Sequence, residues 1–267
     1  ALKRARLNTL GAPATFTFQE LDLVNRDATA DLFATPFDTV VHLAAQAGVR
    51  YSLSNPHAYA DANLVGFLNV LEGCRNGRAA HLIFASSSSV YGAGAATPFS
   101  VHGAADHPVS LYAATKRANE LMAHAYSHLY RLPATGLRFF TVYGPWGRPD
   151  MAYFSFTKAI LAGESIDLYH QGDAARDFTY IDDVVESIAR LINLPATPDP
   201  AWSSTAPDPA TSNAPYRLYN VGNADPIPLR RLVSALEDAI GLKANVRLKP
   251  AQPGDVPVTS ADASDFY

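Results

Sequence analysis

The stretch HLIFASSSSVYG, at residues 81–92, decides the fold of this chain. It begins as a short apolar run, and four serines follow at the point where the run ends. Short apolar runs with polar boundaries are typical of strands buried in a parallel sheet. Open sheets of this kind bind their ligands at the carboxyl ends of the strands. The stretch therefore predicts a parallel strand that carries a ligand-binding end.

Working outward, two more apolar runs resemble this strand, at 38–43 and 134–140. Between the three runs, apolar residues recur at helical spacing within 58–74, and 110–129 reads as a long helix. Ser110 is a good N-cap for that helix, because its hydroxyl can accept from a free backbone N–H. The alternation of strands and helices predicts an α/β fold with a doubly wound, Rossmann-like parallel sheet.

Beyond residue 145 the pattern loosens and predicts a smaller C-terminal α/β lobe. The expected elements, in chain order, are a helix at 153–161, strands at 165–169 and 177–180, a helix at 182–194, a strand at 216–221 and a helix at 230–240 that ends at Gly241. Six prolines between residues 195 and 215 predict a surface loop. We expect a first domain at 1–145, to which segments near 177–194 and 216–222 return, and a lobe at 146–267.

Composition narrows the function classes. The chain has 267 residues, of which 48% are apolar and 17% charged, as in an ordinary globular protein. A net charge of -4 gives no reason to expect a nucleic-acid partner. No apolar run approaches the roughly 18 residues that a membrane span needs. Cys74, the single cysteine, cannot form an internal disulfide and favours the cytoplasm. The sequence indicates no metal site.

Tyr112 and Lys116 are the first candidates for catalysis. They lie four residues apart in the predicted helix at 110–129, so their side chains share one face. A free tyrosine has a pKa of about 10 and is a poor base at neutral pH. We expect the nearby ammonium to lower that pKa, which suits proton transfer with a substrate hydroxyl. The spacing alone leaves open an exposed helical pair with no chemical role.

Several segments together carry a resemblance to a known family. The serines of 86–92 followed by Tyr-x-x-x-Lys resemble the extended short-chain dehydrogenase/reductase family, which includes nucleotide-sugar epimerases, dehydratases and decarboxylases. Further matching segments, in the family's order, are Asp22-Leu23, HLAAQA at 42–47, Asn63 and RDFTYIDD at 176–183. The resemblance implies NAD as the cofactor, a UDP-sugar as the substrate, and a homodimer formed through helices that include the tyrosine helix.

The resemblance also implies roles for individual residues. The catalytic residues are Ser87, Tyr112 and Lys116. The cofactor residues are Asp22, Leu23, Leu43, Ala44, Ala45, Gln46, Asn63, Ser86, Tyr112, Lys116 and Phe139. The substrate residues are Arg50, Ser87, Ser88, Tyr112, Thr141, Arg148, Arg176 and Asp255.

Within the family, the UDP-glucuronate 4-epimerases are the most similar group, through the segments at 45–52, 141–151 and 252–256. Thr141 and Arg148 match the positions that hold the sugar carboxylate, and a guanidinium binds a carboxylate with two parallel hydrogen bonds. Ser88 and Ser89 stand where dehydratases and several decarboxylases of the family carry an acid. Serine cannot move a second proton at neutral pH, so the pair favours simple epimerisation.

The expected reaction is NAD-dependent epimerisation at C4 of a UDP-uronic acid through a 4-keto sugar. The alternatives are a UDP-glucuronate decarboxylase, a 4-epimerase of neutral UDP-hexoses, and a non-catalytic NAD-binding protein of the same fold. One feature departs from the family, because no Gly-rich phosphate loop precedes Asp22. We expect that a first βαβ portion of roughly 30 residues, and the family's last helix, are missing from this sequence.

Overall fold

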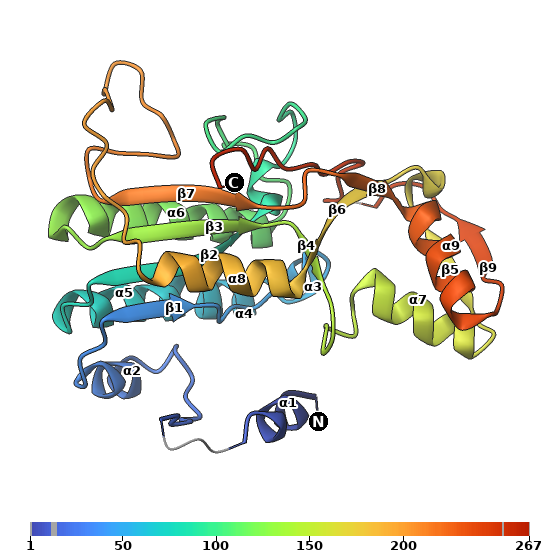
Figure 1. The fold of residues 1–267 in the computed structure, drawn as a ribbon, viewed down its shortest axis with the longest axis horizontal. Coiled ribbons are helices and arrows are strands. Elements are labelled where there is room, and N and C mark those ends of the chain that lie inside the picture. Colours follow the sequence, from blue (N-terminus) through green and yellow to red (C-terminus); the bar gives the residue numbers. More distant parts are fainter. Residues whose placement is uncertain (1, 12–14, 253, 267) are drawn as a thin grey trace.

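Four parallel strands form the sheet of the larger body, on the left in Figure 1. They are β1 (Thr39–His42), β2 (His81–Ser87), β3 (Ala134–Phe139) and β7 (Tyr216–Val221), in that spatial order. The computed structural model describes residues 2–11, 15–252 and 254–266. Ala1, Pro253 and Tyr267, which fall within the expected domains and the 252–256 segment, lie outside the described residues.

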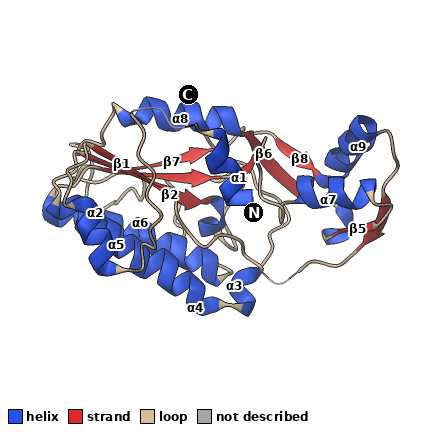
Figure 2. Ribbon diagram, turned by 90° about the horizontal axis from the view of Figure 1, so that it is seen from below, coloured by secondary structure: helices blue, strands red, loops and turns tan. Residues whose placement is uncertain are grey.

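Helices cover both faces of this sheet, with α5 and α6 on one side and α8 on the other (Figure 2). The segment from β1 to β2 contains α3 (Tyr51–Ser54), α4 (Pro56–Tyr59), the π-helix η1 (Ala60–Val65) and α5 (Gly66–Asn76). Helix α6 (Leu111–Tyr130) connects β2 to β3, and α8 (Ile181–Ile192) precedes β7. The predicted α/β fold with a parallel, Rossmann-like sheet is confirmed.

Side chains alternate between two cores along each strand, because successive residues of a strand point to opposite faces. Leu82 and Phe84 of β2 pack toward α5 and α6 with Phe67 and Leu218. Ile83 packs on the opposite face, in a cluster of Leu137, Val184, Leu191 and Val221 beneath α8. Both faces of the central strands are therefore buried, which explains why these strands read as nearly continuous apolar runs.

A smaller lobe extends from the end of β3 (Figure 1). It contains a three-stranded sheet of β4 (Thr141–Tyr143), β6 (Ala175–Tyr180) and β8 (Pro226–Pro228), and a pair formed by β5 (Ser165–Leu168) and β9 (Asn245–Leu248). Helices α7 (Ala152–Leu161) and α9 (Leu229–Ile240) pack on this pair through Phe156, Leu229 and Val233. Only Phe140 separates β3 from β4, so the chain passes from the body to the lobe with a single residue between the two strands.

The remaining elements are α1 (Leu2–Thr9), α2 (Arg26–Phe33), and the 3₁₀ turns η2 (Ser88–Tyr91) and η3 (His170–Gly172). The Ser110 cap and the Gly241 stop are confirmed: the Ser110 hydroxyl accepts from the Ala113 N–H, and Gly241 has a φ of 77°. The segment 195–215 contains no helix or strand, as expected, but residues 210–212 and 214 are buried. The prediction of a surface loop is therefore wrong for its last part, which packs beside β7.

Candidate active site

The amino-terminal turns of α6 place Tyr112 and Lys116 beside the carboxyl end of β2. The Lys116 side chain is buried, and its Nζ donates to the carbonyl oxygen of Ala85 at 2.9 Å. Burial lowers the pKa of Lys116 to about 8, and the negative charge of Glu120 opposes that shift. The predicted neighbourhood of helix and serine-rich strand end is thus formed.

The Ser87 side chain interacts with the Tyr112 phenol and favours its ionised form. The pKa of Tyr112 is nevertheless raised above its ordinary value, because burial of the phenol outweighs the effects of Ser87 and of the positive charge of Arg148. Our expectation that the lysine would leave Tyr112 with a lowered pKa is wrong for this structure. Desolvation is the dominant effect here, and the lysine ammonium is turned toward Ala85.

Asn63 links the tyrosine helix to the loop after β1. Its side chain accepts from the Gln46 N–H at 2.8 Å, and donates to the Gln46 carbonyl at 3.1 Å and to Thr115 at 3.0 Å. Asn63 lies in the π-helix η1, where the N–H of Gly66 bonds to the carbonyl five residues back, at Asp61. Such wide turns are frequent at functional sites. Here the turn directs Asn63 between the two elements that carry the site.

Two aromatic neighbours of this centre were not among the predicted residues. The ring of Tyr59 meets that of Tyr112 edge-on at 6.1 Å, and its hydroxyl donates to the carbonyls of Ala47 and Gly48. His42 is buried at the end of β1, where burial and the charge of Lys116 lower its pKa to about 4. His42 is therefore a neutral imidazole beside the lysine. The family-like HLAA segment was the available signal for His42, whereas no spacing pointed to Tyr59.

The segment that follows β1, at residues 43–45, offers an exposed surface suited to the predicted cofactor. Leu43 is 53% exposed, and Ala44 and Ala45 continue the exposed apolar strip that an aromatic ligand would cover. Gln46 is held by Asn63, and the Leu23 carbonyl accepts a hydrogen bond from Asn69. Asp22 is exposed, and its side chain accepts from the Val24 N–H.

Two predicted cofactor residues are turned into the protein. The Ser86 hydroxyl is buried and donates to Glu120 at 2.6 Å. Phe139 packs in the core beneath α8. Both side chains make contacts inside the protein. At either position, only the backbone could contact the cofactor.

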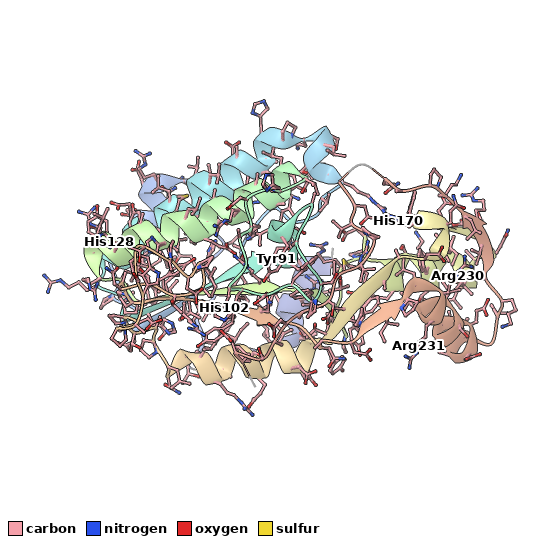
Figure 3. All side chains as sticks on the ribbon, turned by 90° about the horizontal axis from the view of Figure 1, so that it is seen from above. Tyr91, His102, His128, His170, Arg230 and Arg231 are labelled. Atoms are coloured by element: carbon pink, nitrogen blue, oxygen red, sulfur yellow. The ribbon has the colours of Figure 1, made fainter. Side chains whose placement is uncertain are left out.

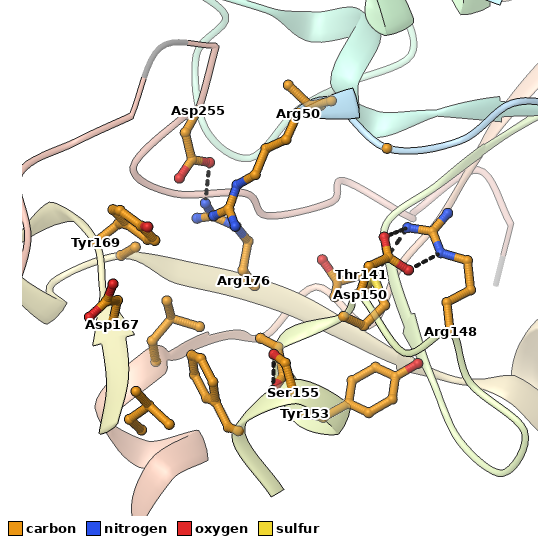
Figure 4. Close-up of a pocket in the computed structure, with 18 of the residues that line it drawn as sticks. Arg50, Thr141, Arg148, Asp150, Tyr153, Ser155, Asp167, Tyr169, Arg176 and Asp255 are labelled. Carbon is orange, nitrogen blue, oxygen red and sulfur yellow. Dashed lines mark hydrogen bonds and ion pairs between the residues drawn. The ribbon is translucent and has the colours of Figure 1, made fainter. Parts of the chain in front are cut away.

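A cavity of about 610 Å³ lies between the body and the lobe (Figure 4). Of the predicted substrate residues it brings together Arg50, Thr141, Arg148, Arg176 and Asp255. The Arg176 guanidinium donates to Asp255 at 2.6 Å, and the Arg50 guanidinium lies over the Tyr169 ring at 5.0 Å. Clustered guanidinium groups of this kind suit a diphosphate.

The Arg148 guanidinium already holds a carboxylate in this cavity. Its Nε and Nη2 donate to the two oxygens of Asp150 at 3.1 and 3.0 Å (Figure 4). This is the paired geometry in which arginine binds a planar carboxylate. Asp150 was not among the predicted residues, and neither were Tyr153, Asp167 and Tyr169, which also line the cavity from lobe segments.

A smaller hollow of about 180 Å³ adjoins the cavity and is lined by Ser88, Ser89, Thr141, Arg176 and Asp255. Ser87 and Tyr112 line neither space. They are connected to the larger one through Tyr59, whose hydroxyl bonds to two carbonyls of its wall at Ala47 and Gly48.

Two absences concern only the part of the chain that the structure describes. Within it, no three His, Cys, Asp or Glu side chains are grouped closely enough to hold a metal ion. None of its helices is both long enough and apolar enough to cross a membrane.

Comparisons with known proteins agree on one family. Residues 2–204 match the model of the NAD dependent epimerase/dehydratase family. Protein CapI of Staphylococcus aureus is 54% identical over 268 residues, which cover 100% of this chain and 80% of that protein. A probable UDP-glucuronate 4-epimerase of Rhizobium meliloti is 52% identical over 239 residues, covering 88% of this chain and 69% of the relative.

A solved structure resembles the whole described fold. The UDP-glucuronic acid 4-epimerase of Bacillus cereus, crystallised with UDP-glucuronic acid and NAD, superposes with a TM-score of 0.83. The sequences are 30% identical, and the match covers 99% of this chain and 78% of the other.

Proposed function

We propose, from the premise that this chain belongs to the NAD dependent epimerase/dehydratase family, that it interconverts UDP-glucuronate and UDP-galacturonate. The coarser activity, NAD-dependent 4-epimerisation of a UDP-sugar, follows from the family and its named relatives. What we propose beyond this activity is that the substrate is a UDP-uronic acid, which residues are catalytic, and that the reaction passes through a 4-keto sugar. A cytoplasmic location is part of it and rests on the buried single thiol of Cys74.

The observation that supports an acid sugar as the substrate is the Arg148–Asp150 ion pair. Arg148 stands beside Thr141 in the cavity, and its two donors are arranged as a carboxylate requires. A substrate carboxylate that reaches this guanidinium has the same planar shape as the Asp150 side chain. A neutral hexose offers only a hydroxymethyl group at that position, which cannot accept two parallel hydrogen bonds.

Three side chains carry the proposed chemistry. Tyr112, as its phenolate, removes the proton of the C4 hydroxyl, while Ser87 donates a hydrogen bond to the oxygen on which charge develops. NAD, when bound, would supply the hydride acceptor and donor for C4. The Lys116 ammonium favours the phenolate. Tyr112 then gives its proton back to the oxygen of the inverted alcohol.

The 4-keto sugar between these two steps is a β-keto acid, which loses carbon dioxide readily. Rotation of the sugar in the cavity would present its other face for hydride return. Thr141 and Arg148 hold the carboxylate ionised and hydrogen-bonded, which opposes its loss as carbon dioxide. Ser88 and Ser89 in the adjoining hollow supply no second acid, which favours epimerisation over a dehydratase- or decarboxylase-type reaction.

Incubation of the NAD-loaded enzyme with UDP-glucuronate tests the proposal. We expect UDP-galacturonate as the product, separated by chromatography and identified by its proton NMR couplings at C4. Formation of UDP-xylose would assign the decarboxylase alternative. Turnover of UDP-glucose alone would assign a neutral-sugar epimerase, and no turnover of any UDP-sugar would leave the non-catalytic alternative.

Replacement of Arg148 is expected to remove the preference for an acid sugar. Arg148→Met should weaken binding of UDP-glucuronate about 10- to 100-fold, because two charge-assisted hydrogen bonds are lost. Binding of UDP-glucose should change less than about threefold, and calorimetry measures both. Arg231→Met, on the exposed face of α9, is the matched control. Equal loss for the two sugars would contradict a carboxylate role for Arg148.

We also propose that the protein is a homodimer that pairs through α5 and α6. An apolar row on the outer side of α6 includes Leu111, Leu121 and Leu129, which are 38%, 57% and 66% exposed. Leu68 of α5 is also exposed, at 36%, and α5 and α6 lie side by side on this face of the sheet (Figure 2). Exposed apolar patches of this kind mark protein contacts, and a self-complementary face gives a two-fold dimer.

The dimer makes a simple prediction. Leu121→Asp places a charge in the centre of the proposed interface and should halve the mass measured by light scattering after gel filtration. Leu161→Asp, on an equally exposed lobe position, should leave the mass unchanged. A wild-type protein that already runs as a monomer would refute the interface.

A further inference from the structure

A buried cluster of charged and polar side chains lies directly behind the catalytic residues. Glu120 of α6 is 0% exposed and comes four residues after Lys116 and eight after Tyr112, so all three lie on one face of the helix. Its Oε1 accepts from Ser86 at 2.6 Å and from Arg138 Nε at 2.8 Å. Its Oε2 accepts from Arg138 Nη2 at 2.9 Å and from Arg117 at 2.8 Å.

The cluster continues across the sheet as a row. Ser86 of β2 is paired in register with Arg138 of β3, and Arg138 with Asn220 of β7. Asn220 accepts from the Tyr91 hydroxyl at 2.6 Å, and the Arg138 guanidinium lies 4.7 Å from the centre of the Tyr91 ring. Tyr91, labelled within the larger body in Figure 3, ends the turn η2 that follows the catalytic strand.

Stability alone does not account for this arrangement. The desolvation of two ions offsets much of their attraction, and apolar residues of similar volume often replace buried ion pairs without loss of stability. The elements that the cluster joins are, however, the ones that carry the proposed chemistry. Strand β2 ends in Ser87, η2 begins with Ser88, and α6 carries Tyr112 and Lys116.

We propose that Glu120 is a positioning residue for the reaction: through Ser86 it fixes the end of β2 against α6, and so sets Ser87 opposite Tyr112 with Lys116 between the two elements. The inference rests on the catalytic roles proposed above for Ser87, Tyr112 and Lys116. Glu120 touches none of the reacting atoms and acts through the strand end and through its charge.

The charge of Glu120 acts on Lys116. The groups that face Lys116 are Glu120 on its own helix, the neutral His42 at the end of β1 and the Ala85 carbonyl of β2. Glu120 itself bonds to Arg138, Arg117 and Ser86, and its charge raises the pKa of Tyr91 and of Tyr216. Glu120 is thus the negative group that opposes the lowering of the Lys116 pKa. Its removal should lower that pKa further below about 8, so the supporting ammonium is lost at a lower pH.

The test compares two variants of the NAD-loaded enzyme across pH. Glu120→Gln should lower kcat about tenfold or more with KM within about twofold, and should move the alkaline limb of the kcat profile to lower pH. Ser86→Ala keeps the charges but cuts the link to the strand end, so it should lower kcat without moving the limb. Glu186→Gln, in the exposed pair with Arg190, is the control and should change neither.

The outcomes separate this inference from the proposed function. A folded Glu120→Gln enzyme with unchanged kcat and an unmoved limb would overturn the positioning role. Should that variant fail to fold, an unchanged kcat in Ser86→Ala overturns it instead. If Tyr112→Phe retains full turnover, the proposed catalytic residues themselves are wrong, whatever Glu120 does.

Discussion

Tyr112→Phe is expected to remove nearly all turnover, lowering kcat by about 10²- to 10⁴-fold, which is the range that a positioned proton-transfer group contributes. The substitution deletes one oxygen and keeps the ring that packs against Tyr59. The C4 proton then loses its proposed acceptor, and neither neighbour replaces it well, because Ser87 is a weak base and burial lowers the pKa of His42 to about 4. Product formation from UDP-glucuronate in single-turnover and steady-state assays measures the loss.

A matched control separates the lost hydroxyl from damage to the helix. Tyr130→Phe removes a phenol at the other end of α6, where the ring meets Tyr126 edge-on. That variant should keep its kcat. Binding of UDP-glucuronate to Tyr112→Phe should remain within about threefold of wild type, because the substitution removes the group that transfers the proton and leaves the binding site in place. Undiminished turnover in Tyr112→Phe would exclude it as the base.

Arg138→Met should lower the free energy of unfolding by about 3–5 kcal/mol, the cost of leaving the partner of a buried ion pair uncompensated. Arg138 is 0% exposed and bonds to both oxygens of Glu120, which is itself 0% exposed. Methionine fills most of the space but leaves the carboxylate with Ser86 and Arg117 alone. Urea unfolding followed by circular dichroism measures the change.

Arg190→Met is the control for that measurement. Arg190 bonds to Glu186 in the same type of pair, but the two side chains are 72% and 60% exposed, so the change should stay below about 0.5–1 kcal/mol. The double variant Glu120→Gln/Arg138→Met removes both charges and should recover part of the loss. If Arg138→Met and Arg190→Met lowered the free energy of unfolding equally, the Arg138–Glu120 ion pair would not be buried and bonded as described.

Much of the fold follows from local pattern. The strands β2 and β3 are buried on both faces and read as apolar runs, and Ser110 and Gly241 mark helix ends by their own chemistry. The short strands β4, β8 and β9 gave no such signal. They have three or four residues each, and their pairing is set by partners far along the chain, such as Ile227 opposite Arg176.

Some residues of the candidate site could likewise be predicted from the sequence, and others could not. Substrate residues expected from motifs, including Arg50, Arg148 and Asp255, come from distant segments and meet in one cavity. Glu120 was missed because a glutamate on a helix is ordinarily solvated. A signal did exist on its partner: Arg138 interrupts an apolar strand that the pattern predicts to be buried, and a buried guanidinium requires a buried acid. The direction of the Tyr112 pKa was missed because burial depends on the whole fold.

The wide turn at residues 60–65 has a consequence for how sequences of this kind can diverge. Each residue of a helix turns the next by about 100°. Gain or loss of one residue here would therefore rotate Asn63 away from Gln46, or swing Phe67 out of the core. Exchange of the exposed Asp61 for another residue disturbs neither. We expect insertions and deletions to be rejected throughout this segment, while substitutions at exposed positions such as Asp61 are accepted. Asn63 is the exception, because its amide makes the bonds to Gln46 and Thr115.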